Sequence, residues 1–213
     1  MIKKLIKYVE GRVKRHYIRK YGVEILEKLN EISASTGKPV WLDYGTLLGA
    51  YRDHGFIPHD IDMDVAMYAK DFDYAFERAL YDRGFKILRK FMMIDAKNPE
   101  NRRVTEITVK YKRVQTDIFF KFAEEGKTYG ILWTDADKDR NICKVYRDFF
   151  DYTGFEETDF LGIKVLTPRN TKEFLQAKYG DDFMTPLPNW QPPKKVYLPL
   201  EEYYGESFGG WIG

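Results

Sequence analysis

Apolar residues recur at helical spacing near the start of the chain, at Ile2, Leu5, Ile6, Val9 and Val13. Lysines and arginines fill the positions between them, so the pattern predicts a basic amphipathic helical arm, residues 1–21. Gly11 is expected to interrupt that helix. Two contacts of the apolar stripe remain open: the rest of the protein, favoured because the stripe carries no Trp or Phe anchor, and an anionic membrane surface.

A second helical stretch opens the folded domain, residues 22–213. Its apolar positions fall on one face, at Val23, Leu26, Leu29 and Ile32. Gly37 and Pro39 are stop signals that end it. We expect this helix to pack in the hydrophobic core.

Short strands and short helices alternate through the core of the domain, about residues 22–123. Strands are predicted at 39–44, 61–67, 85–88, 104–113 and 116–122, and helices at 46–52 and 72–83. Thr46 is the expected N-cap of the first short helix. The last two strands, joined by Val114-Gln115, predict a hairpin. The predicted fold class is therefore α/β (α+β), with a mixed sheet flanked by helices.

The pattern is weaker in the C-terminal part, residues 124–213. It predicts strands at 129–133 and 163–166, a polar loop at 135–141, a helical stretch at 144–150 and a helix at 171–179. Five of the nine prolines lie between Thr185 and Pro199, which predicts an extended surface segment. The aromatic residues that follow are expected to seal the core: Tyr203, Tyr204, Phe208 and Trp211.

The composition is that of a globular protein. Of 213 residues, 44% are hydrophobic, 32% are charged and 16% are aromatic, which excludes a disordered or collagen-like chain. Cys143 is the single cysteine, so no internal disulfide forms and a reducing, cytoplasmic location is expected. No apolar run approaches the roughly 18–20 residues that cross a bilayer.

The net charge of +2 conceals an uneven distribution. Residues 1–20 hold eight of the 35 lysines and arginines and one of the 33 acids, so this segment carries +7 and the remainder −5. A body of that charge offers no basic field for nucleic acid, which is not an expected partner. A polyanionic surface, such as the inner face of a membrane, would meet the arm.

Three aspartates alternate with apolar residues in the run Asp60-Ile61-Asp62-Met63-Asp64-Val65. In a strand, positions i, i+2 and i+4 share one face, so the carboxylates would stand in a row while the apolar residues point into the core. Such a row repels itself and indicates a hard cation, above all Mg²⁺, which proteins hold with one or two carboxylates and substrate phosphates. The alternative is a charged edge strand that prevents aggregation.

The same run resembles the first half of a calcium-binding EF-hand loop, but the match fails. Val65 occupies the position that requires glycine, and Asp71 occupies the position of the bidentate glutamate. A second acidic cluster fails in the same way and is expected to be a solvated loop, with weak calcium binding as the alternative: Asp135, Asp137, Asp139 and Asn141.

Two further features are expected near the aspartate row. At Asp43-Tyr44-Gly45-Thr46 a strand turns through glycine into a helix, where free backbone N–H groups and the helix dipole favour a phosphate. Asp117 begins an otherwise apolar strand, and a buried carboxylate there needs either a metal ion or a basic partner.

Two segments of the sequence resemble the LicD family, which includes the fukutin-related proteins. The first covers residues 41–52, Trp-Leu-Asp-Tyr-Gly-Thr-Leu-Leu-Gly-Ala-Tyr-Arg, and residues 55–65, Gly-Phe-Ile-Pro-His-Asp-Ile-Asp-Met-Asp-Val. The second runs from Pro168 to Asp182, so the likeness spans about residues 38–184. It implies a polymerase-β-like nucleotidyltransferase fold with a C-terminal extension. It also implies transfer of a phospho-alcohol, such as phosphocholine or ribitol phosphate, from a CDP-linked donor to a sugar hydroxyl of a cell-surface glycan or its precursor.

The resemblance assigns the metal and catalytic roles to three acids. The family's metal-binding pair falls on Asp62 and Asp64, and the third carboxylate of the superfamily best matches Asp117. Asp62 and Asp64 would hold Mg²⁺ on the donor diphosphate, while Asp117 would complete a second metal site and take the proton of the acceptor hydroxyl. Mn²⁺ could replace Mg²⁺.

Five residues are expected to contact substrate. Gly45 and Thr46 match the family's turn and would cradle phosphate, and Asp60 would support the metal ligands or contact the acceptor hydroxyl. Arg52 would pair with donor phosphate, with the aspartate row or in a structural salt bridge. Tyr44 would stack on the base. Three nearby residues are expected to be structural: Trp41, His54 and His59.

Two positions depart from the family pattern. The usual Trp-Asp-Asp-Asp run is His59-Asp60-Ile61-Asp62 here, and Asp53 replaces the histidine that commonly follows the family's arginine. Ile61 falls at an inward-facing position, so the outward row of carboxylates survives. Donor and acceptor stay open, as do two other functions: a nucleotidyltransferase that uses a nucleoside triphosphate, and a catalytically silent module that binds nucleotide or glycan.

Overall fold

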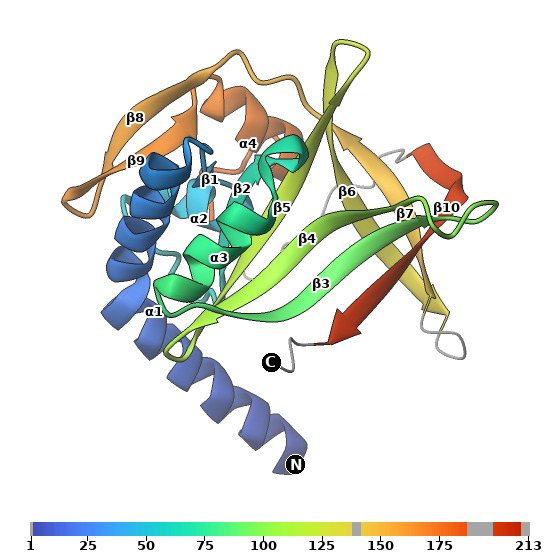
Figure 1. Cartoon of the computed structure of the whole chain (residues 1–213). Helices are drawn as coiled ribbons and strands as arrows, with labels where there is room; N and C mark the ends of the chain where they lie inside the picture. The colour runs from blue at the N-terminus through green and yellow to red at the C-terminus, as the bar shows by residue number, and fades with distance from the viewer. Residues whose placement is uncertain (1, 138–141, 187–197, 210–213) are drawn as a thin grey trace.

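The computed structural model describes residues 2–137, 142–186 and 198–209 (Figure 1). The helices are α1 (Ile2–Thr36), α2 (Tyr44–Leu48), α3 (Tyr74–Asp82) and α4 (Thr171–Tyr179), with a π-helical turn at Gly49–Asp53 and a 3₁₀ turn at Ala69–Asp71. The strands are β1 (Trp41–Leu42), β2 (Met63–Tyr68), β3 (Lys86–Asp95), β4 (Arg102–Tyr111), β5 (Val114–Glu124), β6 (Lys127–Asp137), β7 (Ile142–Phe149), β8 (Phe155–Phe160), β9 (Ile163–Pro168) and β10 (Leu198–Gly209). The predicted mixed α/β class is confirmed.

Most of the described strands belong to one sheet of eight, in the order β1-β2-β5-β4-β3-β10-β7-β6. β6 also pairs with the far end of β5, so the six strands from β5 to β6 close into an antiparallel ring, on the right of Figure 1. β2 lies beside this ring and runs parallel to β5, with β1 on its other edge. β5 therefore joins the ring to the part of the fold that carries α1, α2 and α3.

The two faces of β5 have different surroundings. The ring of Phe120 lies 4.6 Å from that of Phe72, which precedes α3, whereas the ring of Phe119 lies 4.8 Å from that of Tyr44 in α2. Side chains alternate along a strand, so Asp117 shares the α2 side with Phe119. The opposite side is apolar core, where Ile118 is fully buried. The alternation thus directs one carboxylate of β5 toward the turn that begins α2.

α1 is one continuous helix, so the expected interruption at Gly11 is wrong. A glycine inside a helix costs only about 1 kcal/mol relative to alanine, and the good helix formers around it offset that cost. The second half of α1 packs in the core as predicted, because Leu26, Leu29 and Ile32 are buried.

The C-terminal part differs most from the prediction. Residues 144–149, predicted to be helical, belong to β7, which pairs with β6 on one side and with β10 on the other. Neither β8 nor β10 was predicted, and Pro199, expected in an extended surface segment, lies inside β10. Residues 187–197 of that proline-rich segment lie outside the described residues. Trp211 and residues 138–141 of the predicted polar loop also lie outside them.

Two local features of the prediction also need correction. The β4–β5 hairpin is confirmed, but its turn is at Lys112-Arg113, where Lys112 has φ 52°, and Val114-Gln115 already pair with β4. Asp43, not Thr46, is the N-cap residue of α2. Thr46 lies one turn inside that helix, which frees its hydroxyl to bond a neighbouring strand.

Candidate active site

The aspartate run straddles the start of β2 instead of lying wholly within it. β2 begins at Met63, so Asp60 and Asp62 belong to the preceding loop and only Asp64 is held by the sheet. Ile61 is 39% exposed, so its expected inward orientation is wrong, whereas Met63 is fully buried as predicted. The alternation starts only where ladder hydrogen bonds fix the backbone.

The turn before α2 is bonded directly to β2 around Asp64. The Gly45 backbone N–H donates to Asp64 Oδ2 at 2.8 Å, and the Asp64 backbone N–H donates to Thr46 Oγ1 at 2.8 Å. The Asp43 N–H donates to the carbonyl of Asp64 at 3.2 Å. The Gly45 N–H that was expected to cradle phosphate therefore holds a carboxylate in this structure, and Thr46 sets the position of the strand.

Asp117 lies next to Asp64 across the parallel β2–β5 pair, where the two residues are register partners. Adjacent strands are about 4.8 Å apart, so both side chains project from neighbouring backbone positions on the α2 side. The Thr108 hydroxyl of β4 donates to Asp117 Oδ1 at 2.6 Å, which fixes the orientation of that carboxylate. Two carboxylates from different strands are thus brought side by side.

Three acids of the site, Asp60, Asp64 and Asp117, have raised pKa values. Burial, with the nearby charge of Asp62, raises the pKa of Asp60 to about 7, and burial with Asp62 and Asp60 raises the pKa of Asp64 well above its usual range. Burial also raises the pKa of Asp117. None of the three, nor Asp62, forms an ion pair with Lys or Arg in the part of the chain that the structure describes. The salt-bridge alternative for Asp117 is therefore not met.

Glu106 is an additional acid that the sequence analysis missed. It lies in β4 two residues before Thr108, on the face that carries Asp117. Burial raises its pKa to about 8, with the charges of Asp117 and Asp62 adding to the effect and Arg89 and Lys121 opposing it. A lone acid among apolar and threonine positions of a predicted strand was the available signal.

The donor set fits a metal ion that substrate completes. Among the described residues no three acidic, histidine or cysteine side chains gather closely enough to hold one ion by themselves. The carboxylates of Asp60 and Asp64 nevertheless converge, because a Cβ placed on Gly45 would lie 2.7 Å and 2.9 Å from their oxygens. Mg²⁺ commonly takes one or two carboxylates together with substrate phosphates and water.

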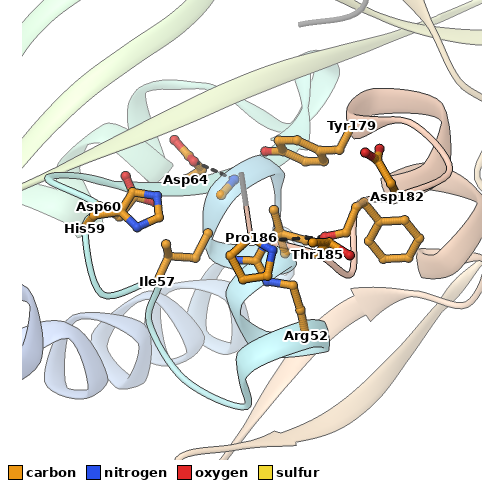
Figure 2. Close-up of a pocket in the computed structure, with 12 residues that line it drawn as sticks. Arg52, Ile57, His59, Asp60, Asp64, Tyr179, Asp182, Thr185 and Pro186 are labelled. Carbon is orange, nitrogen blue, oxygen red and sulfur yellow. Dashed lines mark hydrogen bonds between the residues drawn. The ribbon is translucent and has the colours of Figure 1, made fainter. Parts of the chain in front are cut away.

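A cavity of about 250 Å³ opens beside these carboxylates (Figure 2). Figure 2 shows Asp60 and Asp64 on one side of it and Tyr179 and Asp182, from the end of α4 and the segment after it, on the other. Burial and the charge of Asp64 raise the pKa of Tyr179, so its phenol remains protonated. The remaining lining residues are Gly45, Leu48, Arg52, Ile57, His59, Phe183, Thr185 and Pro186.

Tyr179 and Asp182 line the cavity but were not assigned a role from the sequence, whereas His59, which also lines it, was expected to be structural. The first two belong to the segment that resembles the C-terminal part of the LicD family, and that resemblance was the available signal. They come from a segment more than a hundred positions beyond Asp60, so no local pattern places them beside it.

Arg52 lines the cavity but is held by its neighbours. Its Nε and Nη2 donate to the two carboxylate oxygens of Asp53, each at 2.9 Å, and its Nη1 donates to the carbonyl of Phe183 at 3.3 Å. The guanidinium therefore makes the structural salt bridge, one of its three expected alternatives, and ties the segment after α4 to the π-helical turn.

Tyr44 does not line the cavity, so the structure gives no support to its expected stacking on a base. Its ring packs between Phe119 and Phe174, and the Lys121 ammonium lies 4.5 Å from the ring centroid. Its hydroxyl donates to Asp148 at 3.4 Å. Tyr44 is thus a core residue, as is Trp41, which is 1% exposed.

Gly45→Ala is expected to disrupt the site while leaving the fold intact. The new methyl group would displace the carboxylates of Asp60 and Asp64, with which it would clash at 2.7 Å and 2.9 Å. Alanine is the better helix former by about 1 kcal/mol, so the unfolding free energy should change little. Circular dichroism, urea unfolding and calorimetric Mg²⁺ binding would separate the two effects.

Gly11→Ala is the matched control, because a Cβ there meets only the flexible end of Arg15, at 3.1 Å. It should preserve Mg²⁺ binding. Equal Mg²⁺ affinity in both variants would contradict the proposed closeness of the carboxylates to residue 45.

Comparison with known proteins bears on the same segment. The sequence profile of the LicD/FKTN/FKRP nucleotidyltransferase domain matches residues 37–170. Ribitol-5-phosphate transferase FKTN of Mus musculus is 28% identical over 173 residues, which cover 81% of this chain and 35% of that protein. The Homo sapiens protein of the same name is 27% identical over 173 residues, with the same two coverages of 81% and 35%. An uncharacterized protein of Caenorhabditis elegans is 33% identical over 120 residues, 53% of this chain and 30% of its own length.

The chain spans about a third of the length of the curated relatives it matches, 35% for the two mammalian proteins. The profile match covers more than half of the chain and contains α2, β2 and β5, the elements that carry Gly45, Asp64 and Asp117. The protein therefore belongs to the LicD/FKTN/FKRP nucleotidyltransferase-domain family.

Proposed function

We propose that the protein is a metal-dependent phosphotransferase that moves a phospho-alcohol from a CDP-linked donor to a sugar hydroxyl of a glycan or its precursor. The observation that carries the proposal is that Asp60 and Asp64 line a cavity, that Asp117 is the register partner of Asp64, and that none of the three forms an ion pair with Lys or Arg among the described residues. The relatives named ribitol-5-phosphate transferases support the reaction class and make CDP-ribitol the first donor to test, with CDP-choline second.

In this proposal Asp62 and Asp64 would hold one Mg²⁺ or Mn²⁺ and Asp117 would complete a second metal site, each with oxygens from substrate or water; the metal would supply positive charge for the donor diphosphate. Thr46 and the Gly45 backbone fix Asp64 through the two hydrogen bonds described above. Asp117, oriented by Thr108, accepts the proton of the attacking hydroxyl. The acceptor oxygen forms a bond to the phosphorus next to the alcohol, the bond from that phosphorus to CMP breaks, and CMP leaves.

Product analysis tests the reaction class. Incubation with CDP-ribitol or CDP-choline, a sugar acceptor and Mg²⁺ should release CMP, and Asp62→Ala should abolish that release while circular dichroism stays unchanged. Pyrophosphate released from a nucleoside triphosphate would replace the proposal by a nucleotidyltransferase. Nucleotide binding without metal dependence, and with no product, would indicate the silent module.

Without divalent metal, the unfolding free energy is expected to fall as pH rises from about 4 to about 8. The pKa of Asp60 rises from 3.8 to about 7 and that of Glu106 from 4.5 to about 8, so in this window the folded protein holds protons that the unfolded chain has lost. Each proton held contributes a slope of about 1.4 kcal/mol per pH unit. Carboxylates whose pKa is lowered, such as Glu24, act in the opposite sense, but only at pH values below about 4.5.

Melting temperatures measured in a chelating buffer over that pH range test this expectation, and added Mg²⁺ should flatten the decline above pH 6 because the ion binds the ionised acids. Asp60→Asn should make the decline shallower without metal, and the contribution of Glu106 should remain. A stability that rises with pH would contradict the raised pKa values. A stability at pH 8 that Mg²⁺ leaves unchanged would contradict the metal site.

A further inference from the structure

The N-terminal turns of α1 extend beyond the rest of the protein (Figure 1). Three aliphatic residues in these turns are exposed to solvent: Ile6 by 50%, Val9 by 50% and Val13 by 41%. Aliphatic side chains at helical spacing normally pack against a partner, and the described part of the body does not supply one here.

The direction of this stripe follows from helix geometry. At 100° per residue, Ile6, Val9 and Val13 fall within an arc of about 60°. The residues that pack the later turns of α1 on the body, Ile18 and Leu29 among them, point roughly 150° away from that arc. The stripe therefore faces away from the protein, and the packing alternative favoured by the sequence is wrong.

The arm is also strongly basic, with eight lysines and arginines and one acid in residues 1–20. Among the arm's bases whose side chains the structure describes, Arg12, Lys14, Arg15, Arg19 and Lys20, none forms an ion pair with an acid. An exposed apolar stripe on a helix rich in cations that form no ion pair is complementary to the surface of a bilayer that contains anionic lipids. A nucleic acid would satisfy the cations but not the stripe.

We propose that residues 2–16 of α1 lie on an anionic lipid surface, with Ile6, Val9 and Val13 inserted below the headgroups and the bases among the phosphates. No described helix is long and apolar enough to cross a membrane. Two bonds hold the arm to the active-site region: Lys14 Nζ donates to Gln115 Oε1 at 3.1 Å, and Arg19 Nη2 donates to the Pro58 carbonyl at 3.2 Å. Gln115 is two residues from Asp117, and Pro58 is two residues from Asp60, so the helix that would meet lipid is tied to the two segments that carry these acids.

Flotation of the full chain with vesicles tests this proposal independently of any transfer activity. Vesicles of phosphatidylcholine with 30% phosphatidylglycerol, at low salt, should bind the protein, and pure phosphatidylcholine vesicles should bind it at least about tenfold more weakly. Replacement of the stripe, Ile6→Ser with Val9→Ser and Val13→Ser, should reduce binding at least about tenfold without loss of helix content, because all three side chains are exposed.

Tyr8→Ser is the matched control, because Tyr8 is 61% exposed but lies about 160° from Ile6 around the helix, outside the stripe. It should bind vesicles like the unaltered protein. The proposal is overturned by equal binding of the stripe variant, by binding that ignores lipid charge, or by a dimer or nucleic-acid complex that forms in place of the vesicle complex.

Discussion

Asp64→Asn is expected to reduce transfer at least about a thousandfold and, at the same time, to stabilise the metal-free protein by about 1–2 kcal/mol at pH 7.5. Asp64 is buried among like charges, with Asp62, Asp60 and Asp117 all raising its pKa after burial itself. The amide of asparagine has nearly the same shape, and its oxygen can still accept the 2.8 Å hydrogen bond from the Gly45 N–H. The substitution removes the charge that a metal needs and that the apoprotein tolerates poorly.

Urea unfolding of the metal-free proteins and CMP release in the presence of Mg²⁺ measure the two effects. Asp159→Asn is a suitable control, because Asp159 is another strand aspartate whose side chain is 80% exposed and forms an ion pair with Lys164. It should change neither quantity appreciably. An Asp64→Asn protein that is less stable than the unaltered one would show that the cluster is not in electrostatic conflict, and the case for a cation there would fail.

The sequence predicted those parts of the candidate site whose structure depends on neighbouring residues in the chain. The alternation of Met63, Asp64 and Val65 and the turn at Gly45 depend on neighbouring positions, and both survive in the structure. The placement of Asp117 beside Asp64 depends on one parallel pairing. The family resemblance singled out Asp117 as a third carboxylate, but no local pattern predicted that pairing. What local pattern misjudged was Ile61, because strand geometry does not extend back past Met63.

The ring of strands was not predictable in this way. β7 reads as helical in isolation, and only its pairing with both β6 and β10 makes it a strand. Pairings such as Gly205 with Met93 join positions far apart in the chain. The hydrophobic periodicity of one strand does not indicate which other strand it pairs with. Tyr179 and Glu106 were missed for the same reason, because their roles depend on which distant acids lie across from them.

Lys121→Met is expected to lower the unfolding free energy by about 3–5 kcal/mol, the second large effect. Lys121 is 3% exposed and forms an ion pair with Asp43, which is fully buried. Removal of the ammonium leaves the Asp43 carboxylate in the interior without a countercharge, which is the costly half of any buried pair. Since the Asp43 backbone N–H is bonded to Asp64, the loss should also reach the active site as weaker Mg²⁺ binding.

Two comparisons isolate the charge effect from the loss of packing. Asp43→Asn combined with Lys121→Met should be more stable than Lys121→Met alone, because no buried charge is then left unpaired. Lys112→Met removes one partner of an exposed pair with Glu24, whose side chains are 39% and 37% exposed, and should cost less than about 1 kcal/mol. If Lys121→Met lowered the unfolding free energy in urea no more than Lys112→Met does, the buried ion pair would not be what holds β5 to the turn before α2. The expected effect of that pair on Asp64 and on Mg²⁺ binding would then fail as well.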